Sequence, residues 1–277
     1  MVRRQGAFGP VELRDSCGHR ELLINGQVQG GAYFDPGAEV IWPDLPDTAP
    51  GPISTAAYAN GWLLAGLDHP VSSGLMIGLG SGCGAVQLLA NFPGVDLTIV
   101  EIDPVIVQTA LEGFPLLGYY MDRGMLDIRV ADASDFLAEG HDHWDFGLAD
   151  AYTGEAELVA DHLPDLIRRT DDLYLNVIDR FDGPSMRAIG ECLQAADKPV
   201  REVFKSVPPG LLHVLRDFNC RSNWILTTHP VQWGKASRFQ PFADLPESEE
   251  LLTAQQSWDQ FMSAAVGGRL EGVLASS

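Results

Sequence analysis

The chain has 277 residues, of which 45% are hydrophobic and 20% charged, which is typical of a soluble globular protein with a sizeable core. The formal net charge of −20 repels phosphate backbones, and we therefore expect no nucleic-acid partner. The first residues lack the apolar core of a secretory signal, and no apolar run is long enough to cross a bilayer. We therefore expect no membrane partner. Because the four cysteines are scattered, we also expect a reducing compartment and a cytoplasmic location.

An antiparallel β unit is predicted for residues 10–34. Alternating polar and apolar residues favour strands on both sides of Asn25-Gly26, and both of these residues tolerate the positive φ of a hairpin turn. A proline-rich stretch follows and predicts a loop, and the apolar periodicity of residues 54–66 predicts a helix. Residues 1–70 are therefore expected to form a β-hairpin unit with a connecting helix.

From residue 71 onward, short apolar runs alternate with helical patterns. Continuous apolar runs are typical of strands buried on both faces. Such a run is found at residues 75–79, and a second buried strand is predicted at residues 97–101. Further strands are predicted at residues 126–130, 144–149 and 173–178. One of the intervening helices is expected to start at Asp103-Pro104, because aspartate favours the N-cap and proline the first helical position.

Alternating strands and helices with right-handed crossovers predict a doubly wound, Rossmann-like α/β sheet over residues 71–235. Residues 200–205 and 224–228 are expected to add an antiparallel pair, and residues 236–277 a surface helix and tail. In such sheets, ligands bind at the carboxyl ends of the strands. The residues that end the apolar runs are therefore the candidates for a binding site.

A glycine-rich loop follows the first of these strands. It reads Gly78-Leu79-Gly80-Ser81-Gly82, and its glycines allow a tight turn and let a ligand lie against bare backbone. Such a loop alone is a moderate signal, because a strand–helix turn with nothing bound has the same pattern.

Acidic residues end the next two strands. Glu101 can accept hydrogen bonds from the vicinal hydroxyls of a ribose, worth about 1.5–3 kcal/mol each, whereas the alternative role of helix cap is better filled by Asp103. Asp132 can accept from the amino group of adenine or instead cap the helix that follows. An adenosine held by two acids, without a place for pyrophosphate, indicates a ligand of the S-adenosyl-methionine type.

Asp150 ends the fourth strand, in the stretch LADAYTGEA. Its carboxylate is expected to face the same crevice beyond the ribose, where the sulfonium would lie. There it can orient an incoming amine and accept its proton, or favour the cationic sulfonium directly. The alternative is an acid that only meets solvent at a strand end.

These segments resemble the spermidine synthases, which are aminopropyltransferases. IGLGSGCGA, IVEIDPVIV, VADASDFL and WDFGLADAYTG match the Rossmann part of that family in order and spacing, and LINGQVQ resembles its amino-terminal hairpin motif. The similarity covers roughly residues 10–230. It implies a fold of the class I methyltransferase type, a homodimer, and a small-molecule acceptor. With the strand-end argument, it predicts the cofactor-binding residues Gln29, Gly78, Gly80, Ser81, Gly82, Glu101, Ile102, Asp132 and Ala133, with Asp150 as the catalytic acid.

Three positions depart from the family pattern. The aspartate of its glycine loop is replaced by Ser81, the second acid of its D-x-x-D pair by Thr153, and its D-E-x-x-Y-H-E segment keeps only Tyr58. Because burying an ammonium without a partner acid is costly, these changes predict an acceptor other than a diamine. Loss of the acid at Ser81 also favours ordinary S-adenosyl-methionine over its decarboxylated form. The expected substrate pocket contains Tyr58, Ala151, Tyr152 and Thr153.

The predicted function is transfer of a 3-amino-3-carboxypropyl, aminopropyl or methyl group from an S-adenosyl-methionine-type sulfonium to a small nucleophile. One alternative is a true polyamine aminopropyltransferase that uses decarboxylated S-adenosyl-methionine with an altered acceptor. The other is a non-catalytic nucleoside-binding protein. No metal is expected, because His141 and His143 have the spacing of a ligand pair but precede a strand at the opposite edge of the sheet.

Overall fold

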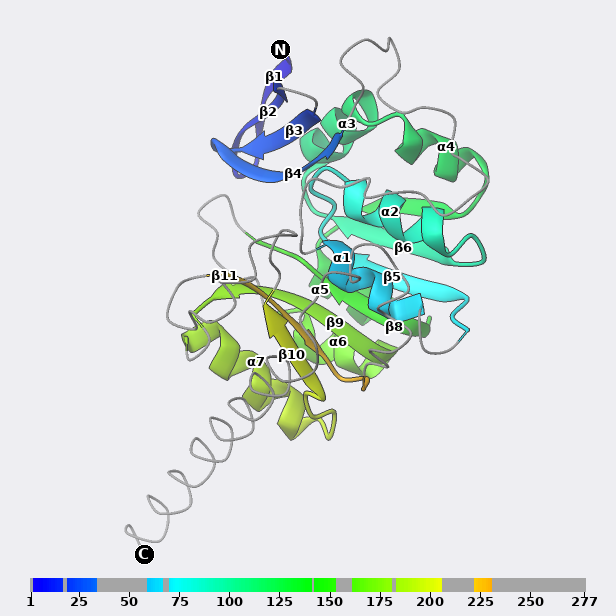
Figure 1. Cartoon of the computed structure of the whole chain (residues 1–277), viewed down its shortest axis with the longest axis vertical. Helices are drawn as coiled ribbons and strands as arrows, with labels where there is room; N and C mark the ends of the chain where they lie inside the picture. Colours follow the sequence, from blue (N-terminus) through cyan, green and yellow to red (C-terminus); the bar gives the residue numbers. More distant parts are fainter. Residues whose placement is uncertain are drawn as a thin grey trace, which may run out of the picture.

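Two β-sheets organise the part of the chain that the computed structural model describes (Figure 1). The described residues are 2–16, 19–33, 59–66, 70–140, 142–152, 161–180, 183–205 and 222–230. A four-stranded antiparallel sheet comes first, and a seven-stranded, mostly parallel sheet follows. The predicted α/β class with a small amino-terminal antiparallel unit is confirmed. The predicted helix in residues 236–277 lies outside the described residues, and the predicted unit boundaries stay predictions.

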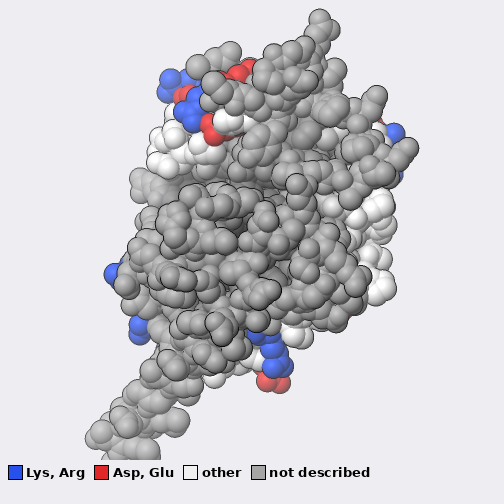
Figure 2. Space-filling view, in the orientation of Figure 1, with Lys and Arg blue, Asp and Glu red and all other residues white. Residues whose placement is uncertain are grey.

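The amino-terminal sheet is a meander in the order β1-β2-β3-β4. Its strands are β1 (Val2–Gly6), β2 (Gly9–Ser16), β3 (His19–Ile24) and β4 (Gln27–Tyr33). The predicted hairpin turn joins β3 to β4, with φ of 50° at Asn25 and 77° at Gly26. Arginines of this sheet pair with neighbouring acids, and basic and acidic side chains lie beside each other on it in Figure 2.

The large sheet has the strand order β10-β11-β9-β8-β5-β6-β7. Its strands are β5 (Ser73–Ile77), β6 (Asp96–Glu101), β7 (Leu126–Val130), β8 (Trp144–Ala149), β9 (Thr170–Asp179), β10 (Glu202–Lys205) and β11 (Ser222–Thr227). The strands β5 to β9 run parallel, and β10 and β11 form the predicted antiparallel pair. Strand order reverses at β5, which pairs with both β6 and β8, so a crevice is expected at their carboxyl ends.

Helices cover both faces of the large sheet. They are α1 (Ala59–Trp62), the 3-10 turn η1 (Leu63–Gly66), α2 (Cys83–Asn91), α3 (Pro104–Gly113), α4 (Leu116–Asp122), α5 (Ala133–Glu139), α6 (Leu163–Arg169) and α7 (Pro184–Ala195). Successive residues of β5 show why its apolar run is continuous: Met76 packs into a core with α2, α3 and α4, whereas Leu75 and Ile77 pack into a second core with α6 and α7. No helix in the described residues is long and apolar enough to span a membrane.

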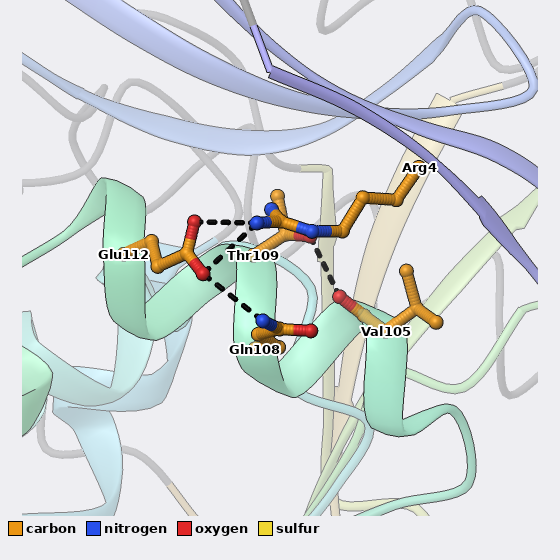
Figure 3. A network of polar contacts seen from close by, with 5 residues as sticks. All are labelled: Arg4, Val105, Gln108, Thr109 and Glu112. Atoms are coloured by element: carbon orange, nitrogen blue, oxygen red, sulfur yellow. Dashed lines mark hydrogen bonds and ion pairs between the residues drawn. The ribbon is translucent and has the colours of Figure 1, made fainter.

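The amino-terminal sheet is attached to α3 by several polar contacts, which include a hydrogen bond from Arg20 in β3 to the carbonyl of Gly113 at 3.3 Å. At the start of α3, Asp103 accepts the N–H of Val105 at 2.8 Å, as the predicted N-cap, and the N–H of Ala7, from the β1–β2 turn, at 2.6 Å. Further along, the guanidinium of Arg4 in β1 donates to both carboxylate oxygens of Glu112 at 2.7 and 2.9 Å (Figure 3). The small sheet is thereby held beside the carboxyl ends of β5 and β6.

Candidate functional site

A pocket of about 280 Å³ lies at the carboxyl ends of β5, β6, β7 and β8. Ten of the residues predicted for the site line it. They are Gln29, Gly78, Gly80, Glu101, Ile102, Asp132, Ala133, Asp150, Ala151 and Tyr152. The parallel strands bring most of them to one edge of the sheet, and β4 adds Gln29 from the amino-terminal sheet. The structure thus gathers these residues around one cavity, and their individual roles stay predictions.

Four predicted residues are not found in this lining. Ser81 is 3% exposed, and its hydroxyl oxygen accepts the N–H of Cys83 at 3.3 Å. Gly82 is the N-cap of α2. The role predicted for Ser81 in choosing the donor therefore stays a prediction, and Tyr58 and Thr153 lie outside the described residues.

The glycine loop, residues 78–82, packs closely against the residue that follows β8 and against β4. At Gly78, with φ of +92°, an added Cβ would lie 2.5 Å from the carbonyl oxygen of Asp150. At Gly80, with φ of +53°, it would lie 2.8 Å from the carbonyl oxygen of Gln29. Both positions therefore require glycine for the loop itself, because other residues rarely adopt this conformation and would clash with backbone.

Glu101 connects the glycine loop to α3. Its carboxylate oxygens accept the N–H of Leu79 at 2.9 Å and of Asp103 at 3.0 Å, and the side chain is 7% exposed. Burial raises the pKa of the Glu101 carboxyl, while the two N–H groups act in the opposite direction. Each carboxylate oxygen has a further lone pair. The carboxylate is thus fixed in place before any ligand arrives and can still accept ligand hydroxyls.

Asp132 performs one of the two roles predicted for it. Its Oδ1 accepts the N–H of Ser134 at 2.8 Å, so it caps α5. The same residue lines the pocket. Since a carboxylate has several acceptor sites, the cap leaves room for a hydrogen bond from a ligand.

Asp150 and Tyr152 are both held by β9. The Nδ2 of Asn176 donates to Oδ1 of Asp150 at 2.8 Å. The hydroxyl of Tyr152 donates to the carbonyl of Asn176 at 2.5 Å and accepts the N–H of Ile178 at 2.7 Å. The hydroxyl thus bonds the backbone of β9 beyond the end of β8, where β8 no longer pairs with it. Tyr152 also lines the pocket, and its role toward an acceptor stays a prediction.

No family model matches the chain. A stretch of 86 residues, 31% of the chain, is 33% identical to a probable polyamine aminopropyl transferase of Bifidobacterium longum (strain NCC 2705) and spans 18% of that relative's length. The structure is similar to a probable spermidine synthase from Corynebacterium glutamicum ATCC 13032, with a TM-score of 0.56, 16% identity and coverage of 86% of this chain and 85% of that one. The chain therefore has a fold of the spermidine-synthase type.

Two further solved structures have the same fold. A spermidine synthase in complex with the transition state analogue AdoDATO has a TM-score of 0.55 and 11% identity, covering 89% of this chain and 76% of that one. The spermidine synthase from Thermotoga maritima has a TM-score of 0.54 and 11% identity, covering 89% and 75%. At such identities these likenesses concern the fold alone.

The pocket also contains residues that sequence reasoning missed. Phe8 and Ile24 come from the amino-terminal sheet, and Asp161 and His162 come from the turn before α6. Ile24 lies in the segment LINGQVQ, from which the resemblance predicted Gln29 alone, whereas Phe8, Asp161 and His162 belong to no recognised motif. Burial lowers the pKa of the His162 imidazole, against the opposing charges of Asp132 and Asp161, and so favours the neutral ring.

The charged groups around the pocket are acidic. Among the described lining residues, these groups are Glu101, Asp132, Asp150 and Asp161, and none is a lysine or arginine. Such a lining favours a cationic ligand over a phosphate or a carboxylate.

The described residues contain no group of three potential metal ligands. His143 pairs instead with Asp171 at 2.8 Å on the surface, and His141 lies outside the described residues.

Proposed function

We propose that this protein transfers an alkyl group from a sulfonium of the S-adenosyl-methionine type to a small nucleophile. The observation that carries the proposal is the convergence of Glu101 and Asp150 on one pocket whose charged lining is acidic in the described residues. The fold adds support, since a spermidine synthase of similar fold was solved with a transition state analogue. A homodimer and a cytoplasmic location stay predictions from the sequence.

The donor would lie across the strand ends, with its adenine at β7 and its sulfonium at β8. Asp132 and Ala133 would contact the adenine, and Glu101 would accept hydrogen bonds from the ribose hydroxyls. Gly78 and Gly80 allow the backbone to approach the ligand closely. The sulfonium would then be directed toward Asp150.

The reaction would be an in-line displacement at a carbon bound to sulfur. The lone pair of the nucleophile forms the new bond to this carbon, and the carbon–sulfur pair stays on sulfur, which leaves as a neutral thioether. Asp150 accepts the proton that the nucleophile loses. Orientation of the two reactants and exclusion of water supply the remaining acceleration.

The test is a product analysis with S-adenosyl-methionine, or its decarboxylated form, and a panel of small amines and thiols. Methylthioadenosine as product would identify transfer of a propyl-type group, and S-adenosyl-homocysteine would identify methyl transfer. Asp150→Asn keeps size and polarity but removes the proton acceptor. It is expected to lower turnover by roughly 10²–10⁴-fold while donor affinity stays within a few-fold of wild type.

Wild-type turnover in Asp150→Asn would contradict the proposed role of this residue. Tight binding of the donor without either nucleoside product, across the whole panel, would instead favour the non-catalytic alternative.

A further inference from the structure

Asn176 is a buried polar residue in the interior of β9. It is 1% exposed, and β9 lies between β8 and β11 in the sheet. Its side-chain Nδ2 donates to the carboxylate of Asp150 at 2.8 Å, and its main-chain carbonyl accepts from Tyr152 at 2.5 Å. One residue of β9 thus holds both pocket residues that follow β8.

The side-chain amide of Asn176 donates to Asp150 although its own oxygen accepts no hydrogen bond from the described residues. Its Oδ1 is buried and has no hydrogen bond in the described part of the structure. Leaving a buried acceptor without a partner is unfavourable. Reversing the amide would place its oxygen against the carboxylate of Asp150, which is also unfavourable. The observed orientation therefore fits an ionised Asp150, whose carboxylate oxygens can only accept hydrogen bonds.

A second asparagine on the same face of the sheet lacks this contact. In the antiparallel register of β9 and β11, Asn176 lies opposite Ile225 and Asn223 lies opposite Ile178, so both asparagines point to one side. The Oδ1 of Asn223 is likewise buried without a partner among the described residues. Asn223 has no hydrogen bond to Asp150, and so offers a matched control.

We propose that Asn176 is a positioning residue that keeps Asp150 ionised and fixed at the pocket. A hydrogen bond donated to a carboxylate stabilises the charged form and lowers the pKa of the acid. It also fixes the rotamer of the side chain that must meet the nucleophile. The consequence for catalysis rests on the proposed function, whereas the consequence for the Asp150 carboxyl does not.

The first test is the pKa of the Asp150 carboxyl, followed by NMR in protein with ¹³C-labelled aspartate and assigned with Asp150→Asn. In Asn176→Leu, which keeps the branched shape of the side chain but loses the donor, the pKa is expected to rise by about one to two units. In Asn223→Leu it should stay at the wild-type value. The other titratable groups around the pocket, Glu101, Asp132, Asp161 and His162, are present in every variant, so the difference reports the lost donor.

An unchanged pKa in Asn176→Leu, or an equal rise in Asn223→Leu, would overturn the proposal. Asn176→Asp provides a second variant of the same shape. Its new acid can donate to Asp150 only while protonated, so the two carboxyls must share one proton and titrate as a coupled pair, with one step well above the ordinary range. Two independent titrations in the ordinary range would contradict the contact.

Turnover separates this proposal from the proposed function. Asn176→Leu is expected to lower kcat with little change in donor affinity, because Asn176 does not line the pocket. If the pKa of Asp150 rises as expected while turnover is unchanged, the positioning by Asn176 is upheld and the catalytic role of Asp150 is overturned.

Discussion

Single residues of the site combine a structural task with a place in the pocket. Glu101 accepts two backbone N–H groups from elements on either side of it, and Asp132 caps α5. Tyr152 uses its hydroxyl to bond the backbone of β9. A substitution at these positions is therefore expected to affect both the local backbone and the ligand, and tests of function need a measurement of stability beside them.

His162 predicts a pH dependence of stability. In the folded protein, burial lowers the pKa of His162 below its ordinary value of 6.5. At a pH between the folded and the unfolded pKa, the unfolded chain therefore binds the proton more readily. The free energy of unfolding is thus not reduced by His162 above about pH 6.5, and it decreases as the pH falls below this value. His162→Gln removes the titrating group, and we expect its melting temperature to fall less than that of wild type between about pH 7.5 and 5.

Thermal unfolding of both proteins over this range provides the measurement. Other acids and histidines are shared by the two proteins, so the difference between the curves isolates His162. Parallel curves would show that the imidazole is not held neutral by burial.

Among the elements, α3 connects the amino-terminal sheet to the large one through contacts of unequal weight. Asp103 is 1% exposed and accepts from Val105 and Ala7. The side chains of Arg4 and Glu112 are 29% and 44% exposed, so water competes with their ion pair. The buried carboxylate should therefore matter more than the visible salt bridge.

Asp103→Ala is expected to lower the free energy of unfolding by about 2–3 kcal/mol, because a helix cap and a buried acceptor are lost together. Glu112→Ala should cost about 1 kcal/mol or less. Urea unfolding of the two variants and wild type checks this order. Equal losses, or a larger loss in Glu112→Ala, would mean that the exposed pair dominates the attachment.

The elements also show which parts of the fold can be predicted from sequence. Strands β5, β6, β8 and β9 can be predicted from mainly apolar runs, because most of their residues are buried on both faces. The edge strand β7 instead alternates apolar and charged residues, and its Val130 is exposed. Strand β1 and helix α4 were missed. Both are short, and β1 is polar, with Arg4 and its neighbours only partly covered. In α4, Leu117 is buried against Gly82, a tertiary contact that leaves no local pattern.

The same distinction applies to the pocket. Glu101, Asp132 and Asp150 could be predicted because topology alone places strand ends together. Asp161 and His162 could not, since the turn before α6 reaches the pocket only through packing against the sheet. The contact from Asn176 to Asp150 joins neighbouring strands at a register that the sequence does not specify.

At the scale of the whole molecule, the pocket is a product of both sheets. The large sheet supplies the acids at its strand ends, and the amino-terminal sheet closes the pocket with Phe8, Ile24 and Gln29. The net charge of −20 and the acidic lining both favour a cationic donor. The proposed function therefore requires that an adenosyl sulfonium binds in this pocket, with Glu101 as its main hydrogen-bond acceptor.

Calorimetric titration with S-adenosyl-methionine and, separately, with its decarboxylated form tests this requirement most directly. It is carried out in wild type, Glu101→Ala and the control Glu112→Ala, which removes an acid of α3 outside the pocket lining. We expect saturable binding to wild type, an affinity about 10–100-fold lower in Glu101→Ala from the loss of charged hydrogen bonds, and wild-type affinity in the control. Urea unfolding at the titration temperature verifies that Glu101→Ala is folded. An unchanged dissociation constant in folded Glu101→Ala, or no binding of either form to wild type, would contradict the account.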